Sequence, residues 1–207
     1  MTPERFVKLL QDQKLSDEHR HNFYCPSEEN PGEARMKSKN LLLYLKKMQE
    51  LDPKILLVGE APGYKGCKRS GIPFTSEYQI LNNDFFKGEF EVFNTDNPKC
   101  EKSAKVIWDT IEKTRQFPLM WNIYPFHPST RDGRNGKPNA KDVDMGKDIL
   151  EKLLTMFNIS CMYCIGRKSE YALKNHKLFK GYVRHPSHGG IRECKESLEN
   201  ILNRFTK

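Results

Sequence analysis

The sequence predicts an α/β protein, a three-layer α/β/α sandwich with a central, mostly parallel four-stranded sheet. Short apolar runs alternate with longer amphipathic segments, which indicates strand–helix–strand units joined by right-handed crossovers. The run at residues 55–58 is apolar throughout and is followed at once by turn-forming residues, which is typical of a strand buried on both faces. Both observations favour parallel strands covered by helices on each side.

The periodicity places the elements in alternating order. Strands are expected at residues 54–59, 119–124, 159–165 and 178–184. Helices are expected at residues 33–51, around 104–111, and at 144–157 and 194–205, where apolar residues recur at helical spacing. Two loops rich in Pro, Gly and Asn, residues 22–32 and 127–139, are long enough to be either functional or disordered.

A chain of 207 residues can bury one substantial core. We therefore expect a single domain over residues 1–207, with residues 1–50 as an N-terminal helical extension packed on it. No apolar stretch approaches the roughly 20 residues that a membrane helix needs, and the first residues lack the features of a secretory signal. The expectation is a soluble, cytoplasmic monomer without membrane partners.

The formal net charge of +8 favours a polyanionic partner. Lys65, Lys68 and Arg69 follow the first strand closely, so positive charge gathers near the end of that strand. Such a cluster suits a phosphate backbone. Lysines kept only for solubility are the alternative.

The six cysteines do not form an obvious metal or disulfide pattern. Cys161 and Cys164 stand in a CxxC, but within a predicted strand residues three apart point to opposite faces. Without an export signal, reduced thiols are the default. We expect no metal, no cofactor and no disulfide framework.

Three of the four predicted strands are followed or ended by unusual polar residues: Glu60 after the first, Asn122 within the second and His185 after the fourth. Parallel strands would bring these ends to one edge of the sheet, where open α/β sheets bind ligands. An acid, a carboxamide and an imidazole, with Phe74 as an aromatic face, could bind a heteroaromatic ring and polarise it. Each could instead be structural: a cap, a backbone partner, a hydrogen-bonded histidine or a core residue.

Taken together these motifs resemble the uracil-DNA glycosylase superfamily. The resemblance rests on GEAPG at residues 59–63, Phe74 in GIPF, Asn122 after an apolar run and HPS at residues 185–187. It covers residues 54–190, and GEAPG is especially similar to the bacterial and archaeal iron–sulfur uracil-DNA glycosylases.

The resemblance implies that the target base is flipped out of DNA into a pocket at the sheet edge. Phe74 would stack on uracil, and Asn122 would hydrogen-bond its pyrimidine edge, because a carboxamide matches O4 and N3–H of uracil but not the reversed pattern of cytosine. His185 would donate to O2 as charge builds on the leaving base. Glu60 would orient water or offset the positive charge of the sugar.

The segment that begins at His185 is implied to contact DNA through Ser187, His188, Gly189 and Ile191, with His188 or Ile191 as the wedge that fills the space left by the base. For the glycine pair at 189 and 190, a plain turn into the last helix is about as plausible.

Gly59, Ala61 and Gly63 would line the base pocket, but two of them depart from the pattern of the best-known uracil-specific branch. Ala61 stands where that branch has a general-base Asp, and Gly63 where it has the Tyr that excludes the thymine methyl. The cysteine spacing also differs from that of the iron–sulfur relatives, because only Cys25 precedes the motif. We expect no iron–sulfur cluster.

The leading hypothesis is a monofunctional DNA glycosylase of base-excision repair that hydrolyses the N-glycosidic bond of uracil in DNA. No Lys occupies a motif position suited to a Schiff base, so lyase activity is not expected. One alternative is a glycosylase for another deaminated or modified base, such as hypoxanthine, xanthine or a modified pyrimidine. Another is a DNA-binding member of the superfamily with little catalysis.

Overall fold

The computed structural model describes residues 1–15, 17–26 and 30–205. In chain order its elements are α1 (Pro3–Gln11), β1 (Arg20–His21), α2 (Pro31–Leu51), β2 (Ile55–Gly59), α3 (Cys67–Ser70), α4 (Glu77–Asn82), η1 (Asp84–Phe86), α5 (Lys102–Thr114), β3 (Leu119–Asn122), β4 (His127–Pro128), α6 (Ala140–Leu154), β5 (Cys161–Ile165), α7 (Arg167–Leu173), β6 (Phe179–Val183) and α8 (Ile191–Asn203).

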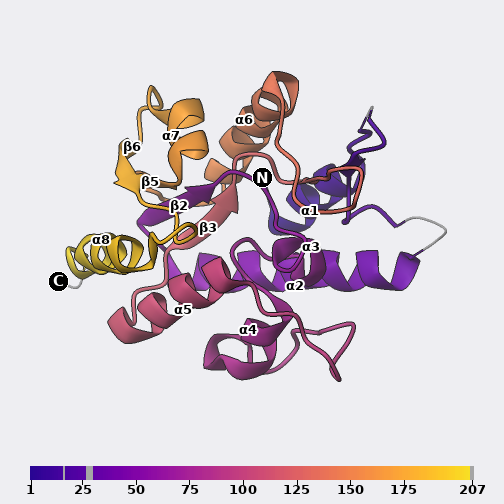
Figure 1. Ribbon diagram of the computed structural model, residues 1–207, viewed down its shortest axis with the longest axis horizontal. Coiled ribbons are helices and arrows are strands. Elements are labelled where there is room, and N and C mark those ends of the chain that lie inside the picture. The colour runs from indigo at the N-terminus through magenta and orange to yellow at the C-terminus, as the bar shows by residue number, and fades with distance from the viewer. Residues whose placement is uncertain (16, 27–29, 206–207) are drawn as a thin grey trace.

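The main sheet has four parallel strands in the order β3-β2-β5-β6. Figure 1 shows α6 and α7 on one face of this sheet and α2, α5 and α8 on the other. The sequence-based prediction of a three-layer α/β/α sandwich is therefore confirmed. Each of the four strands lies within the range expected for it.

Strand β2 is central because its residues are apolar on both faces. All five are buried, and Leu56, Leu57 and Val58 have no exposed surface. Burial of each such side chain contributes about 1.5–3 kcal/mol, so the strand is strongly held between the two helical layers. The register aligns Gly59 of β2 with Asn122 of β3, so these two strands end level with one another.

The structure corrects several helix bounds: α2 begins at Pro31 rather than at 33, α6 ends at Leu154 rather than at 157, and α8 ends at Asn203 rather than at 205. Helix α6 begins at Ala140 rather than at 144, because Asn139 and Asp142 form a capping box: each side chain accepts a hydrogen bond from the other residue's backbone N–H, at 3.0 and 2.8 Å. Helix α8 begins at Ile191 rather than at 194.

Both predicted loops contain regular structure: strand β4 lies in the first, residues 127–139, and the start of helix α2 lies in the second, residues 22–32. The loop at residues 127–139 opens with β4, which pairs antiparallel with β1 and aligns His127 with His21. In the loop at residues 22–32, residues 27–29 lie outside the described part of the chain, and α2 begins at Pro31.

The N-terminal helices pack on the same core as the sheet. The ring of Phe6 in α1 meets that of Trp121 in β3 edge-on, at 5.4 Å between centroids. The hydroxyl of Tyr44 in α2 accepts a hydrogen bond from the backbone N–H of Met120, at 2.8 Å. None of the helices in the described residues is long and apolar enough to cross a membrane.

Candidate active site

A pocket of about 700 Å³ opens at the carboxyl ends of the parallel strands. Because β2 and β3 end level and β6 lies in the same sheet, the residues that follow these strands reach one place. Of the residues proposed from the sequence, those that line this pocket are Gly59, Glu60, Ala61, Gly63, Phe74, Asn122, His185, Ser187, His188, Gly189 and Ile191.

Phe74 forms one wall of the pocket from a strained turn. Its φ of 52° lies in the left-handed region, which costs an aromatic residue energy and persists only where the surroundings impose it. Ser70 and Thr75 supply that constraint, because the Ser70 hydroxyl donates to the Thr75 carbonyl at 2.7 Å and the Thr75 hydroxyl to the Pro73 carbonyl at 3.1 Å. Trp108 donates to the Thr75 hydroxyl at 3.1 Å and ties the turn to α5.

Gly59 lets two of the site residues approach each other. A Cβ atom at this position would overlap Cζ of Phe74 and would lie 2.9 Å from Oδ1 of Asn122. The ring and the carboxamide are therefore placed side by side against the backbone of β2. Only a glycine leaves the room for this arrangement.

Asn122 presents an unused carboxamide to the pocket. The residue is only 4% exposed, yet its side chain makes no hydrogen bond to any residue that the structure describes. Its backbone is fixed by the pairing of β3 with β2, and the next backbone N–H, of Ile123, donates to the Gly59 carbonyl at 2.9 Å. The side chain lines the pocket and its donor and acceptor are unused, so this group is placed to bind a ligand.

His185 is oriented by the residue two positions after it. Its Nδ1 accepts a hydrogen bond from the backbone N–H of Ser187 at 3.2 Å and lies 2.8 Å from the Ser187 hydroxyl oxygen. Because Nδ1 acts as an acceptor, the neutral ring carries its proton on Nε2. Burial lowers the pKa of His185 below its ordinary value, and the charges of Arg184 and His188 lower it further. The imidazole is thus a neutral donor at neutral pH.

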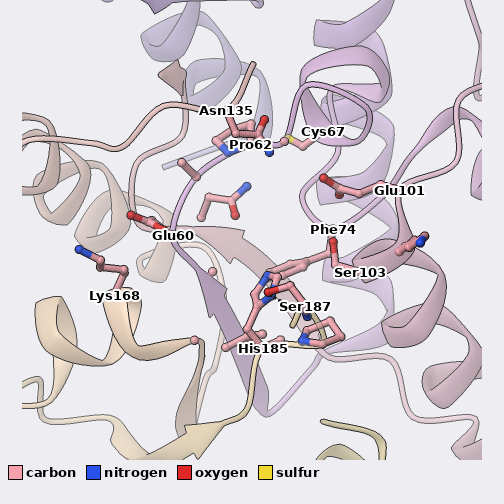
Figure 2. Close-up of a pocket in the computed structure, with 18 of the residues that line it drawn as sticks. Glu60, Pro62, Cys67, Phe74, Glu101, Ser103, Asn135, Lys168, His185 and Ser187 are labelled. Carbon is pink, nitrogen blue, oxygen red and sulfur yellow. Dashed lines mark hydrogen bonds between the residues drawn. The ribbon is translucent and has the colours of Figure 1, made fainter. Parts of the chain in front are cut away.

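Glu60 lies across the pocket from Phe74, and Figure 2 shows its carboxyl group on the side where Lys168 stands. Burial raises the pKa of Glu60, while the charges of Lys168 and Lys137 act to lower it. The side chain is only partly buried and remains open to the pocket. Its backbone carbonyl accepts from the N–H of Tyr124 at 3.0 Å, which joins the turn after β2 to the end of β3.

The other predicted DNA contacts divide into two groups. Ser187, His188 and Gly189 are exposed at the pocket mouth, and Ile191 is 46% exposed. His188 and Gly189 both have positive φ, which makes this loop a sharp projecting turn.

Lys65, Lys68 and Arg69 do not line the pocket. Arg69 donates to the carboxylate of Glu77, which is only 1% exposed, at 2.8 Å. That guanidinium is therefore committed to an ion pair within the protein.

Several lining residues were not proposed from the sequence. Lys168 follows β5, the one strand whose end carries no Pro or His signal. Three others come from the start of α5, which follows no strand directly in the sequence: Glu101, Lys102 and Ser103. Asn135 belongs to the loop at residues 127–139, and its side chain accepts from the backbone N–H of Tyr64 at 2.8 Å.

Three exposed cations surround the mouth of the pocket: Lys102, Arg167 and Lys168. Arg167 also pairs with Glu170 at 2.7 Å and stacks over the ring of Tyr182 at 4.1 Å. A positive rim of this kind favours a polyanion. Within the described residues, no group of three or more His, Cys, Asp or Glu side chains is arranged to hold a metal ion, and all six cysteines are free.

Comparison with known proteins identifies the architecture. The family model described as the uracil DNA glycosylase superfamily matches residues 45–204. The crystal structure of wild-type Pedobacter heparinus SMUG2 is similar in fold, with a TM-score of 0.63 over 98% of this chain and 96% of that chain, at 15% sequence identity. No protein with a curated description matches the chain.

Proposed function

Because the chain belongs to the uracil-DNA glycosylase superfamily, it is a DNA glycosylase that hydrolyses N-glycosidic bonds, and we propose that the base it releases is uracil. The observation that carries the proposal is Asn122, a buried carboxamide with no partner among the described residues that faces the pocket beside Phe74. A planar ring stacked on Phe74 would bring its polar edge to this amide. The amide offers both a donor and an acceptor, which matches N3–H and O4 of uracil.

The chemistry follows from the remaining side chains. As the glycosidic bond breaks, negative charge gathers on the base and positive charge on the sugar. The Nε2–H of neutral His185 would donate to O2 and stabilise the departing anion without any proton transfer. Glu60 would hold the attacking water or face the positive sugar. Ala61 supplies no carboxylate, so Glu60 is the acid that the turn after β2 offers.

The positive rim supports DNA as the substrate. Lys102, Arg167 and Lys168 line the pocket and are exposed, and in this proposal they contact the phosphates on either side of a flipped nucleotide. Such contacts weaken as the salt concentration rises, because release of the counterions condensed on DNA then gains less free energy. Ser187, His188 and Ile191, at the pocket mouth, would enter the space that the base leaves in the duplex.

The direct test is release of free uracil from uracil-containing single- and double-stranded oligonucleotides. We expect release by the wild-type protein, with strand cleavage only after alkali. Asn122→Ala should lower kcat/KM by about 10²-fold, because two hydrogen bonds worth up to about 1.5 kcal/mol each are lost. Asn175→Ala, at an exposed asparagine that does not line the pocket, is the control.

The same assay with hypoxanthine and xanthine separates the alternatives. Release of one of these bases without uracil would replace the proposed substrate while leaving the glycosylase chemistry in place. Activity of Asn122→Ala equal to that of Asn175→Ala would show that this amide does not bind the base.

Gly59→Ala tests the stacking arrangement. The added methyl group would overlap the Phe74 ring and crowd Asn122. We expect at least a tenfold loss of kcat/KM for uracil and a stability loss of about 1–3 kcal/mol from overpacking. Gly32→Ala is the control, because a Cβ there meets nothing within 4 Å. Enzyme kinetics and thermal unfolding measure both effects, and full activity in Gly59→Ala would contradict the stacking role of Phe74.

A further inference from the structure

Glu101 occupies the N-cap position of α5 but does not cap the helix. Its side chain accepts no hydrogen bond from a backbone N–H of the first turn, which is the bond that a capping side chain makes. Its backbone N–H donates to the Ser76 hydroxyl at 3.3 Å, which fixes the residue against the turn before α4. The carboxyl group instead lies near the Ser103 hydroxyl, and both residues line the pocket.

Two glycines make room for this carboxyl group. A Cβ atom built on Gly63 would overlap Oε1 of Glu101 and lie 3.0 Å from its Cδ. A Cβ atom on Gly66 would overlap Oε2 and lie 2.7 Å from the same Cδ. The carboxyl group thus fills the space that a side chain at position 63 would take. Position 63 is where the uracil-specific branch carries its thymine-excluding tyrosine.

Glu101 is partly buried in the wall of the pocket. Burial raises the pKa of Glu101, and the Ser103 hydroxyl opposes that change by hydrogen bonding. No cation of the described residues forms an ion pair with it. Its location is therefore not explained by a salt bridge.

The ring of Phe74 lies between Glu101 and His185 (Figure 2). In a pyrimidine, C5 lies directly across the ring from C2, which carries O2. A uracil stacked on Phe74 with O2 at His185 would therefore present C5 toward Glu101. Asn122 would meet the N3 and O4 edge between these two positions.

We propose that Glu101 is a specificity-determining residue whose carboxyl group closes the C5 edge of the base pocket and excludes the methyl group of thymine. This inference rests on the proposed function. Uracil, with hydrogen at C5, fits against the carboxyl group, whereas a methyl group requires space that Oε1 and Cδ already fill. In the uracil-specific branch a side chain at position 63 excludes the thymine methyl group. In this protein Glu101, at the start of α5, takes that role.

The test compares release of uracil and thymine from the same oligonucleotide, with each base opposite guanine. We expect Glu101→Ala to raise the thymine-to-uracil ratio of kcat/KM by about 10- to 200-fold, the range that one methyl group is worth in a fitted pocket. Glu101→Gln keeps the volume and should keep the wild-type ratio. Glu112→Ala, an exposed glutamate on the same helix, is the matched control and should also keep it.

A second set of variants tests the same contact independently. Gly63→Ala should reduce kcat/KM for uracil, because the new methyl group displaces the Glu101 carboxyl into the pocket. In the double variant with Glu101→Ala that loss should be largely reversed, which is the non-additivity expected of touching groups. Thermal unfolding checks that each variant is folded.

The outcomes separate the two proposals. An unchanged thymine-to-uracil ratio in folded Glu101→Ala, or additive effects of the two substitutions, would overturn the role of Glu101 alone. If Glu101→Ala does not fold, the other two variants decide. A raised thymine-to-uracil ratio in Glu101→Gln would overturn the role of Glu101. An unchanged kcat/KM for uracil in Gly63→Ala would overturn it as well. No uracil release by the wild-type protein would remove the proposed function and, with it, this inference.

Discussion

His185→Ala is expected to lower the rate of uracil release by about 10²- to 10³-fold with little change in stability. This is the usual cost of removing one hydrogen-bond donor that is aimed at developing negative charge. The Ser187 N–H fixes the proton on Nε2, and the lowered pKa of His185 keeps the ring neutral. The loss should appear in the single-turnover rate constant, because the hydrogen bond from His185 to O2 strengthens as the glycosidic bond breaks.

The pH profile gives a second measure of the same residue. A pKa below the ordinary 6.5 means that the neutral ring persists as the pH falls through 6.5. At still lower pH a proton on Nδ1 would turn the Ser187 N–H contact into a repulsive one. We expect the rate of the wild-type protein to decline only below pH 6.5. The part of this decline that comes from protonation of His185 should be absent from His185→Ala. His19→Ala, at a histidine that does not line the pocket, serves as the control. Equal rates in His185→Ala and His19→Ala would contradict the role of His185.

The parts of the site that lie at strand ends could be predicted from the sequence. A strand buried on both faces leaves a continuous apolar run, so the end of β2 and the polar residue after it are visible without a structure. Parallel pairing then brings Glu60, Asn122 and His185 to one edge. Their side-chain orientations were not predictable, because they depend on Gly59, on the strained Phe74 and on the Ser187 backbone.

Glu101 could not be found in this way. It follows a loop rather than a strand, and its place in the pocket depends on how α5 packs beside Gly63 and Gly66. Lys168 was missed for a simpler reason, because β5 ends without a Pro or His signal. The pairing of β1 with β4 involves two residues in each strand, too few to produce a periodic pattern.

The start of α6, in contrast, was available in the sequence. Asn139 followed three residues later by Asp142, at the start of an amphipathic segment, is a capping pattern. Apolar spacing alone predicts a start at residue 144, four residues after the helix begins at Ala140. Capping residues therefore define this boundary better than hydrophobic periodicity does.

His127 is expected to make the protein less stable in acid. Its ring is fully buried and stacks near His21 at 6.0 Å, and Nδ1 contacts the Pro62 carbonyl at 2.7 Å while Nε2 has no partner among the described residues. Burial lowers the pKa of His127 to about 4, and the charges of Lys68 and His21 act in the same direction. The contact between His127 and Pro62 joins β4 to the turn that carries Glu60.

The sign of the effect follows from which state binds the proton. Between pH 6.5 and about 4 the unfolded chain holds a proton on His127 and the folded protein does not. Stability is therefore complete above pH 6.5 and falls as the pH drops through this window. A difference of about 2.5 in pKa corresponds to a loss of roughly 3 kcal/mol by pH 4.

His127→Asn provides the measurement. Its side-chain amide can replace the Nδ1–H donor to Pro62 but cannot take up a proton in this range. Chemical denaturation at several pH values should show a flatter decline of the free energy of unfolding than in the wild-type protein. His21→Gln controls for the neighbouring histidine. If the wild-type and His127→Asn curves ran parallel from pH 7 to 4, the buried imidazole would not be the source of the acid sensitivity, and the contact with Pro62 would be purely structural.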